Sequence, residues 1–124
     1  KNMAAPNLVN VSSILGKTMG ATLGTTVTTD ILTCPSDKVL KINSIIVSNI
    51  DGTNAANLTC YFYDNSASAR YSLATTIEVP ADSTLVVVGK DSPIYLEESD
   101  HIEAGTDNTN DLAIIISYEE LDDA

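Results

Sequence analysis

Few residues of this 124-residue chain have side chains suited to catalysis or metal binding. The single histidine, His101, stands between Asp100 and Ile102, with acidic residues on both sides in the sequence. A zinc centre or a nucleophile triad needs further Cys, His or Asp side chains at a recognisable spacing, and neither cysteine stands at such a distance. The pattern therefore favours a histidine at the surface or at a strand edge, among acids, without a catalytic role.

The two cysteines, Cys34 and Cys60, also give no sign of chemistry. Cys60 falls on the apolar face of an alternating segment, which is typical of a small buried hydrophobic residue, and Cys34 directly precedes Pro35. We expect buried thiols, with a Cys34–Cys60 disulfide as the alternative that the sequence leaves open.

Adjacent carboxylates occur at Glu97-Glu98, Glu119-Glu120 and Asp122-Asp123. A glycosidase needs two carboxylates recessed in a cleft, with aromatic side chains on which the sugar can stack. Here the acids cluster in predicted turns and at the C-terminus, and the chain has no Trp, one Phe and five Tyr. The Asp- and Asn-rich segment 107–111 carries oxygen ligands suited to calcium but lacks the spacing of a calcium-binding loop. We therefore predict no catalytic residue, no cofactor and no metal ligand.

Charge and motif spacing argue against nucleotide and nucleic-acid binding. Gly16-Lys17-Thr18 resembles the end of a phosphate-binding loop, but Val11 occupies the position at which that loop needs a glycine. The formal net charge is −11, and residues 63–124 carry −12 of it while residues 1–62 carry +1. A phosphate-binding surface requires a cationic footprint, so DNA and RNA are not expected partners. The acidic half is either a solvated face or a face that docks on a basic partner surface.

The elements that must carry these residues are predicted to be strands. Residues 38–63 predict a β-hairpin at the centre of the core, because two segments rich in β-branched and aromatic residues flank a polar turn. The first of these segments is apolar on both faces, which predicts a central strand or a bulge near Asn43-Ser44. Further strands are predicted at residues 9–23, 25–34, 71–79, 84–89, 94–96, 101–105 and 112–119. In the strand at 71–79, alternation predicts one common face for Tyr71, Leu73, Thr75, Ile77 and Val79. Residues 84–89 are the most apolar of these segments and predict a buried strand.

The predicted architecture is an all-β fold, an antiparallel β-sandwich of about eight strands with jelly-roll or Greek-key connections. Sheets with one apolar face must cover it against each other when no helix is available. The predicted organisation is an extended N-terminal arm at residues 1–8, a single sandwich domain at 9–119 and an acidic tail at 120–124. No apolar segment approaches the about 20 residues that a membrane-spanning helix needs, so no membrane contact is expected.

Three segments carry a resemblance to a known group of proteins. They are SNIDGTNAANLTCYFY at residues 48–63, PADSTLVV at 80–87 and IYLEE at 94–98. In these segments the chain resembles small virion structural proteins of tailed bacteriophages, especially the contractile-tailed phages of marine cyanobacteria. The resemblance covers about residues 4–119 and is specific for the group but not for the role within the virion.

The resemblance implies a non-enzymatic virion structural protein, most specifically a capsid decoration protein assembled in the host bacterial cytoplasm. The implied partners are other copies of the chain, in a trimer or another closed oligomer, and the major capsid or other virion proteins. Sheet edges or the N-terminal arm would make the contacts. The alternatives are a neck, tail or fibre-associated subunit and, in another class, a carbohydrate- or calcium-binding module. The interface residues expected at the N-terminal end of the chain are Asn2, Met3, Pro6, Asn7, Leu8 and Val9.

Overall fold

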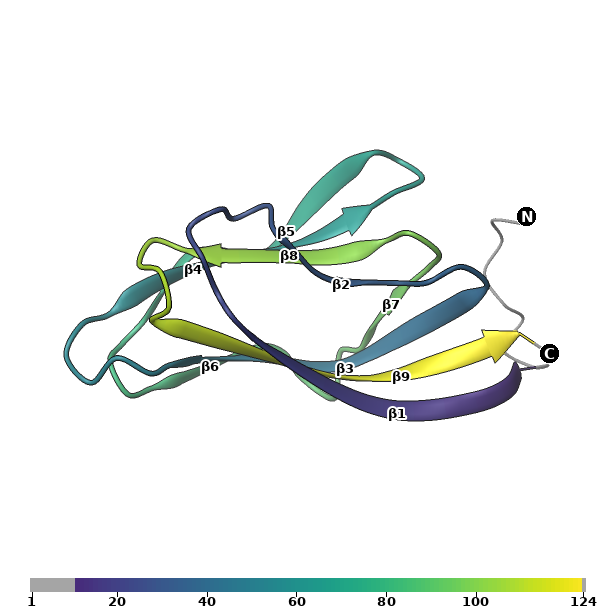
Figure 1. Ribbon diagram of the computed structural model, residues 1–124, viewed down its shortest axis with the longest axis horizontal. Helices are drawn as coiled ribbons and strands as arrows, with labels where there is room; N and C mark the ends of the chain where they lie inside the picture. Colours follow the sequence, from purple (N-terminus) through teal and green to yellow (C-terminus); the bar gives the residue numbers. More distant parts are fainter. Residues whose placement is uncertain (1–10, 124) are drawn as a thin grey trace.

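The computed structural model describes residues 11–123 and consists of nine strands in two antiparallel sheets, with no helix in that range. The sheets lie face to face as two layers (Figure 1). The predicted all-β sandwich is therefore confirmed. The predicted interface residues Asn2 to Val9 lie outside the described residues.

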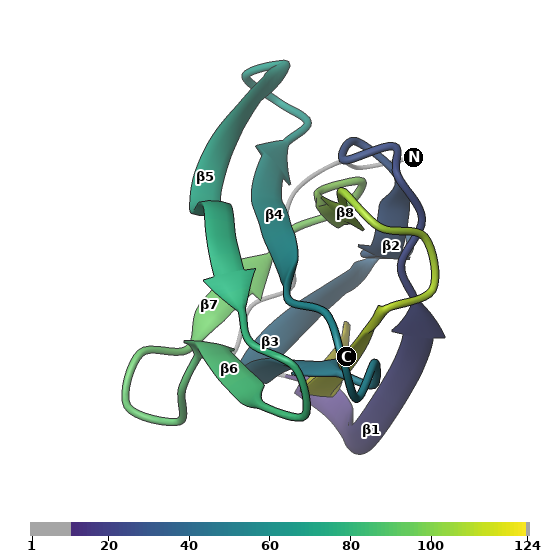
Figure 2. The same ribbon diagram turned by 90° about the vertical axis from the view of Figure 1, so that its left-hand side faces the viewer.

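The larger sheet has the strand order β1-β9-β3-β6, and β7 also pairs with β3. The smaller sheet has the order β2-β8-β4-β5. Figure 2 shows the two sheets from one end, with β4 and β5 leaning away from the larger sheet. The bounds are β1 Val11–Thr22, β2 Asp30–Thr33, β3 Lys38–Asn49, β4 Ala56–Asp64, β5 Ala69–Val79, β6 Thr84–Val88, β7 Ile94–Leu96, β8 His101–Thr106 and β9 Leu112–Asp123.

The predicted hairpin over residues 38–63 is wrong. β3 lies in the larger sheet and β4 in the smaller one, so the two strands face each other across the core. Asn49 ends β3 with a buried amide whose Nδ2 donates to the carbonyl oxygens of Asn54 and Val79, both at 2.9 Å. Its Oδ1 accepts the backbone N–H of Asp51 at 2.8 Å. These contacts turn the chain from one sheet into the other.

Other features of β3 are as predicted. The strand pairs with β9 on one side and with β6 and β7 on the other, so it is central in its sheet. Its register against β9 shifts between Ile42 and Ser44, which confirms the bulge near Asn43-Ser44. Because of this extra residue, Ile42 and Ile45 both face the core, although strict alternation would place them on opposite faces.

Three further predictions need correction. β6 is an edge strand at which Val88 is buried but Val86 is 61% exposed, so residues 84–89 do not form a buried strand. In β5 the predicted common face of residues 71–79 is interrupted, because Thr76 has a positive φ of 49° and the register against β4 shifts there. β9 continues to Asp123 and pairs with β1 and β3, so residues 120–123 belong to the sheet and are not a tail.

The core between the sheets consists of aliphatic side chains from both layers. Its largest fully buried members include Ile42, Ile45, Leu58, Ile102 and Ile114. Cys34 and Cys60 are buried and free, so no disulfide joins them. Burial raises the pKa of each thiol to about 12, which keeps both protonated and unreactive at neutral pH.

Candidate functional site

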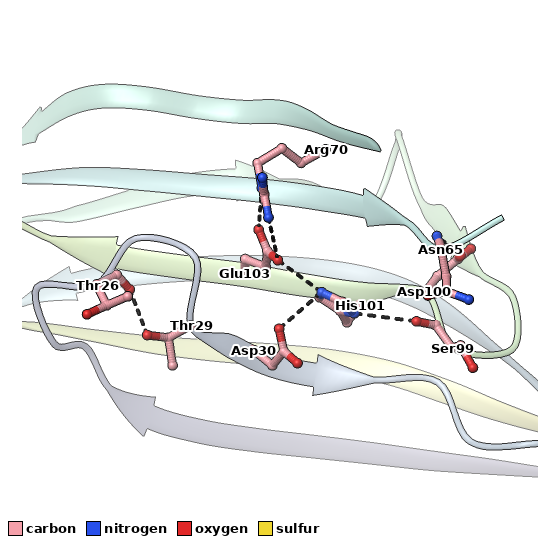
Figure 3. Close-up of polar contacts among 9 residues, drawn as sticks. All are labelled: Thr26, Thr29, Asp30, Asn65, Arg70, Ser99, Asp100, His101 and Glu103. Carbon is pink, nitrogen blue, oxygen red and sulfur yellow. Dashed lines mark hydrogen bonds and ion pairs between the residues drawn. The ribbon is translucent and has the colours of Figure 1, made fainter. Parts of the chain in front are cut away.

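A cluster of ionisable side chains lies on the outer face of the smaller sheet. Asp30 comes from β2, His101 and Glu103 from β8, and Arg70 from β5 (Figure 3). The strand register explains the grouping, because Asp30 is paired with Glu103, and Thr33 with His101. Residues 101 and 103 are two apart on one strand and therefore share a face.

His101 joins two carboxylates through a single ring nitrogen. Its Nε2 lies 3.0 Å from Asp30 Oδ1 and 3.0 Å from Glu103 Oε2. Its Nδ1 lies 3.4 Å from the carbonyl oxygen of Ser99. The ring of Tyr63 stacks on the imidazole, with centroids 4.6 Å apart and planes inclined by 12°. The imidazole is thus held in position by its ring face and by both of its nitrogens.

Glu103 is the buried member of the cluster, with a side chain only 4% exposed. Arg70 Nε donates to its Oε1 at 2.9 Å, and Arg70 Nη2 donates to its Oε2 at 3.4 Å. Burial alone would raise the pKa of Glu103, but the hydrogen bonds and positive charge of Arg70, together with the contact with His101, outweigh it and lower that pKa. The Arg70 guanidinium also lies over the rings of Tyr61 and Tyr63, at 5.8 and 5.4 Å from their centroids.

The lowered pKa of Glu103 makes part of the stability depend on pH. A carboxylate whose pKa is depressed by folding stabilises the fold above its unfolded-state pKa, and this contribution is lost as pH falls through the folded-state pKa. We expect Arg70→Met to lower the melting temperature by several degrees at about pH 7 and by progressively less as the pH falls through the lowered pKa of Glu103, because the carboxyl then becomes protonated. Differential scanning fluorimetry across this range measures the difference.

Lys90→Met is the matched control, because it removes one exposed positive charge without touching the cluster. Its effect should vary little with pH compared with that of Arg70→Met. If the loss of melting temperature varied with pH in the same way for both variants, Arg70 would have no special interaction with Glu103.

The sequence did not identify this cluster. His101 lies on the outer face of the smaller sheet, but its side chain is only 13% exposed and β8 is an interior strand between β2 and β4, so the predicted surface or strand-edge position is wrong. The acids that contact it are Glu103 and Asp30, and its neighbour Asp100 is turned away to accept the backbone N–H groups of Asn65 and Glu97. The i, i+2 spacing of His101 and Glu103 was a readable signal, whereas the approach of Asp30 depends on the pairing of β2 with β8.

Two of the other acids singled out in the sequence, Glu98 and Asp107, hold turns together. Glu98 is buried and accepts the backbone N–H of Asp37 at 3.1 Å. In the segment with possible calcium ligands, Asp107 accepts both the backbone N–H and the side-chain amide of Asn57 at 2.8 Å. These hydrogen bonds engage both Asp107 oxygens and lower its pKa.

A second feature is the outer face of the larger sheet, where three neighbouring rows of side chains carry no charge. The middle row runs across all four strands of the β1-β9-β3-β6 path, through Gly20, Ile115, Ile46 and Val86. Val86 is 61% exposed and Ile115 40%. We call this surface the uncharged face. Its first row is Thr18, Ser117 and Ser44, its middle row is Gly20, Ile115, Ile46 and Val86, and its third row is Thr22, Ala113, Ser48 and Thr84.

Two pairs of hydroxyl groups on the uncharged face bond to each other across neighbouring strands. Thr18 and Ser117 hydroxyls lie 3.3 Å apart, and those of Ser48 and Thr84 lie 3.1 Å apart. Beside this face, Lys41, Asn43, Ser44, Lys90 and Glu119 line a surface depression. The uncharged face is therefore a mixed patch of aliphatic and hydroxyl side chains next to a charged rim.

No helix long and apolar enough to cross a membrane occurs in the described part of the chain. No protein-family model matches the sequence, and no curated protein matches it.

Proposed function

We propose that this protein is a non-enzymatic structural subunit of a bacteriophage virion, most specifically a decoration protein that forms a closed oligomer on the capsid surface. The observation that carries the proposal is the uncharged face on a chain whose net charge is −11. The phage setting is supported by the resemblance of residues 48–63, 80–87 and 94–98 to virion structural proteins.

Charge favours a second copy of the chain as the occupant of the uncharged face. Two chains of net charge −11 repel each other, and the repulsion is greatest where acidic surfaces meet. The three rows of the uncharged face carry no charged side chain, so a contact between two copies through these rows places no like charges against each other. It also buries Ile46, Val86 and Ile115, which the monomer leaves partly or largely exposed. Burial of such apolar surface stabilises association by about 25 cal/mol per Å² before the entropy cost of binding.

The ionisable cluster supports a role without catalysis. Glu103 is held by Arg70 and His101, and His101 is held by two carboxylates, a carbonyl and an aromatic ring. A general acid or base needs a group that can reach a substrate proton. Here the groups are directed at one another along the sheet surface.

The oligomer contact predicts a specific effect of charge. We expect the double variant Val86→Lys/Ile115→Lys to raise the dissociation constant of the oligomer at least about 100-fold, because unpaired ammonium groups would be buried in the contact. The two lysines also lower the magnitude of the net charge, so general repulsion between subunits falls. Any loss of association therefore reports the local contact. Sedimentation velocity over a concentration series measures it.

The matched control is Tyr71→Lys/Ile77→Lys, which adds the same charge at two residues of β5 in the other sheet, 56% and 42% exposed. This control should associate like the unmodified chain. If the control dissociated while the Val86→Lys/Ile115→Lys variant remained an oligomer, the interface would lie on the smaller sheet.

The placement on the virion needs a separate experiment. Cryo-electron microscopy of phage particles that contain the chain should show its density in closed oligomers on the head surface. Density confined to the neck, tail or fibres would contradict the decoration role and keep the broader assignment as a virion structural protein.

A further inference from the structure

We propose that Asp30, His101 and Glu103 form a binding site for one divalent transition-metal ion of the zinc class. Among the described residues, these three make the one group of His, Cys, Asp and Glu side chains whose candidate ligand atoms all lie within 4.8 Å of one another. The ligand atoms are Asp30 Oδ1, His101 Nε2 and Glu103 Oε2 (Figure 3).

The spacing of these atoms fits coordination of a single ion. Nitrogen and oxygen ligands lie about 2.0–2.2 Å from zinc, so two ligands of one ion are about 3.0–3.5 Å apart. The two distances from His101 Nε2 to the carboxylate oxygens are both 3.0 Å. The two carboxylate oxygens lie within 4.8 Å of each other, and the exposed Asp30 side chain is free to move and bring its oxygen to the distance that one ion needs.

The second ring nitrogen supports the same conclusion. A backbone carbonyl only accepts hydrogen bonds, so the contact of Nδ1 with Ser99 assigns a proton to Nδ1. In the neutral imidazole Nε2 then presents a lone pair toward two carboxylate oxygens, which are also acceptors. Three converging lone pairs need a shared cation, which is either a metal ion or a proton on Nε2. A metal-binding histidine commonly donates its other N–H to a carbonyl in this way.

The surroundings define what the ion would be and how it would be held. One imidazole and two carboxylates suit zinc or a similar transition metal, whereas calcium takes six to eight oxygen ligands. Arg70 Nε donates to Glu103 Oε1 at 2.9 Å, while Glu103 Oε2 lies closer to His101 Nε2, at 3.0 Å, than to Arg70 Nη2, at 3.4 Å. Tyr63 fixes the imidazole ring. Asp30 is 59% exposed, so water can enter and fill the remaining coordination positions. The Arg70 charge opposes the bound cation and weakens the site relative to one without it.

A proton could take the place of the metal ion, because a protonated Nε2 would donate hydrogen bonds to both carboxylates. Isothermal titration calorimetry of the tag-free, chelator-treated chain with ZnCl₂ at about pH 7 separates the two. We expect saturable binding of one Zn²⁺ per chain and no comparable binding of Ca²⁺. Because the chain has one histidine, its imidazole NMR signals belong to His101 and should shift with the same stoichiometry.

Asp30→Asn tests the ligand set without disturbing the buried members, since Asp30 is largely exposed. It should lower the Zn²⁺ association constant at least about tenfold, while Asp91→Asn, an exposed carboxylate of the β6–β7 connection, should change it less than about twofold. Absence of saturable Zn²⁺ binding would leave the proton as the occupant and overturn the proposal. Unchanged affinity in Asp30→Asn, or unshifted His101 signals at saturation, would also overturn it.

Discussion

Replacing Asn49 with alanine is expected to lower the free energy of unfolding by about 3–5 kcal/mol. The side chain is 3% exposed and makes three hydrogen bonds, two to carbonyl oxygens of Asn54 and Val79 and one from the N–H of Asp51. Alanine removes all three and leaves buried polar groups of the backbone without partners. Because the total stability of a small domain is about 5–15 kcal/mol, this single change removes a large share of it. Urea denaturation followed by circular dichroism gives the value.

Asn54→Ala is the control for this prediction. Asn54 lies in the same connection and is exposed, and its side chain makes one contact, Nδ2 to Asp51 Oδ2 at 3.3 Å. We expect Asn54→Ala to change the free energy of unfolding by no more than about 0.5 kcal/mol, as for most surface substitutions. Equal effects of the two variants would mean that Asn49 does not hold the crossing between the sheets.

Gly105→Ala is the second change for which we expect a large effect, a loss of about 2–4 kcal/mol. A Cβ at this position would lie 2.6 Å from Val27 Cα and 2.8 Å from the carbonyl oxygen of Thr26. Both are backbone atoms and cannot turn aside as a flexible side chain would. The β1–β2 connection would have to move away and lose the bonds from Thr106 N to Gly24 O and from Ala104 N to Thr29 O, at 2.9 and 3.1 Å.

Gly16→Ala provides the comparison, because a Cβ there meets no atom within 4 Å. At this exposed strand position the substitution should leave the free energy of unfolding unchanged or raise it slightly, since alanine restricts the unfolded chain more than glycine does. A Gly105→Ala variant as stable as Gly16→Ala would show that the connection does not pack on β8 as described. The connection leads directly into Asp30, so Gly105→Ala should also weaken the contact of Asp30 with His101.

Much of the sandwich follows from local sequence. Alternation in residues 58–63 and the turn-forming residues between segments predict strands, and the double-sided apolarity of residues 38–49 predicts the central strand and its bulge. The partner of a strand is not a local property. Residues 38–63 look like a hairpin because Asp51 and Gly52 favour a turn, yet Asn49 binds the end of β5 and diverts the chain into the other sheet.

The same limit applies to the candidate site. His101 and Glu103 are two residues apart, so their common face is readable from the sequence. Asp30 is far from them in the chain and reaches them through the pairing of β2 with β8, which contains a register shift.

The exposure of Val86 was also unpredictable, because a run of valines gives no sign of whether its strand lies at the edge or the centre of a sheet.

The most direct test of the assembly role is the mass of the purified chain by light scattering at micromolar concentration and physiological salt. We expect a discrete multiple of the 13.1 kDa chain mass, which persists on dilution and is lost in Val86→Lys/Ile115→Lys. A mass of 13.1 kDa for the unmodified chain over the whole concentration range would contradict it.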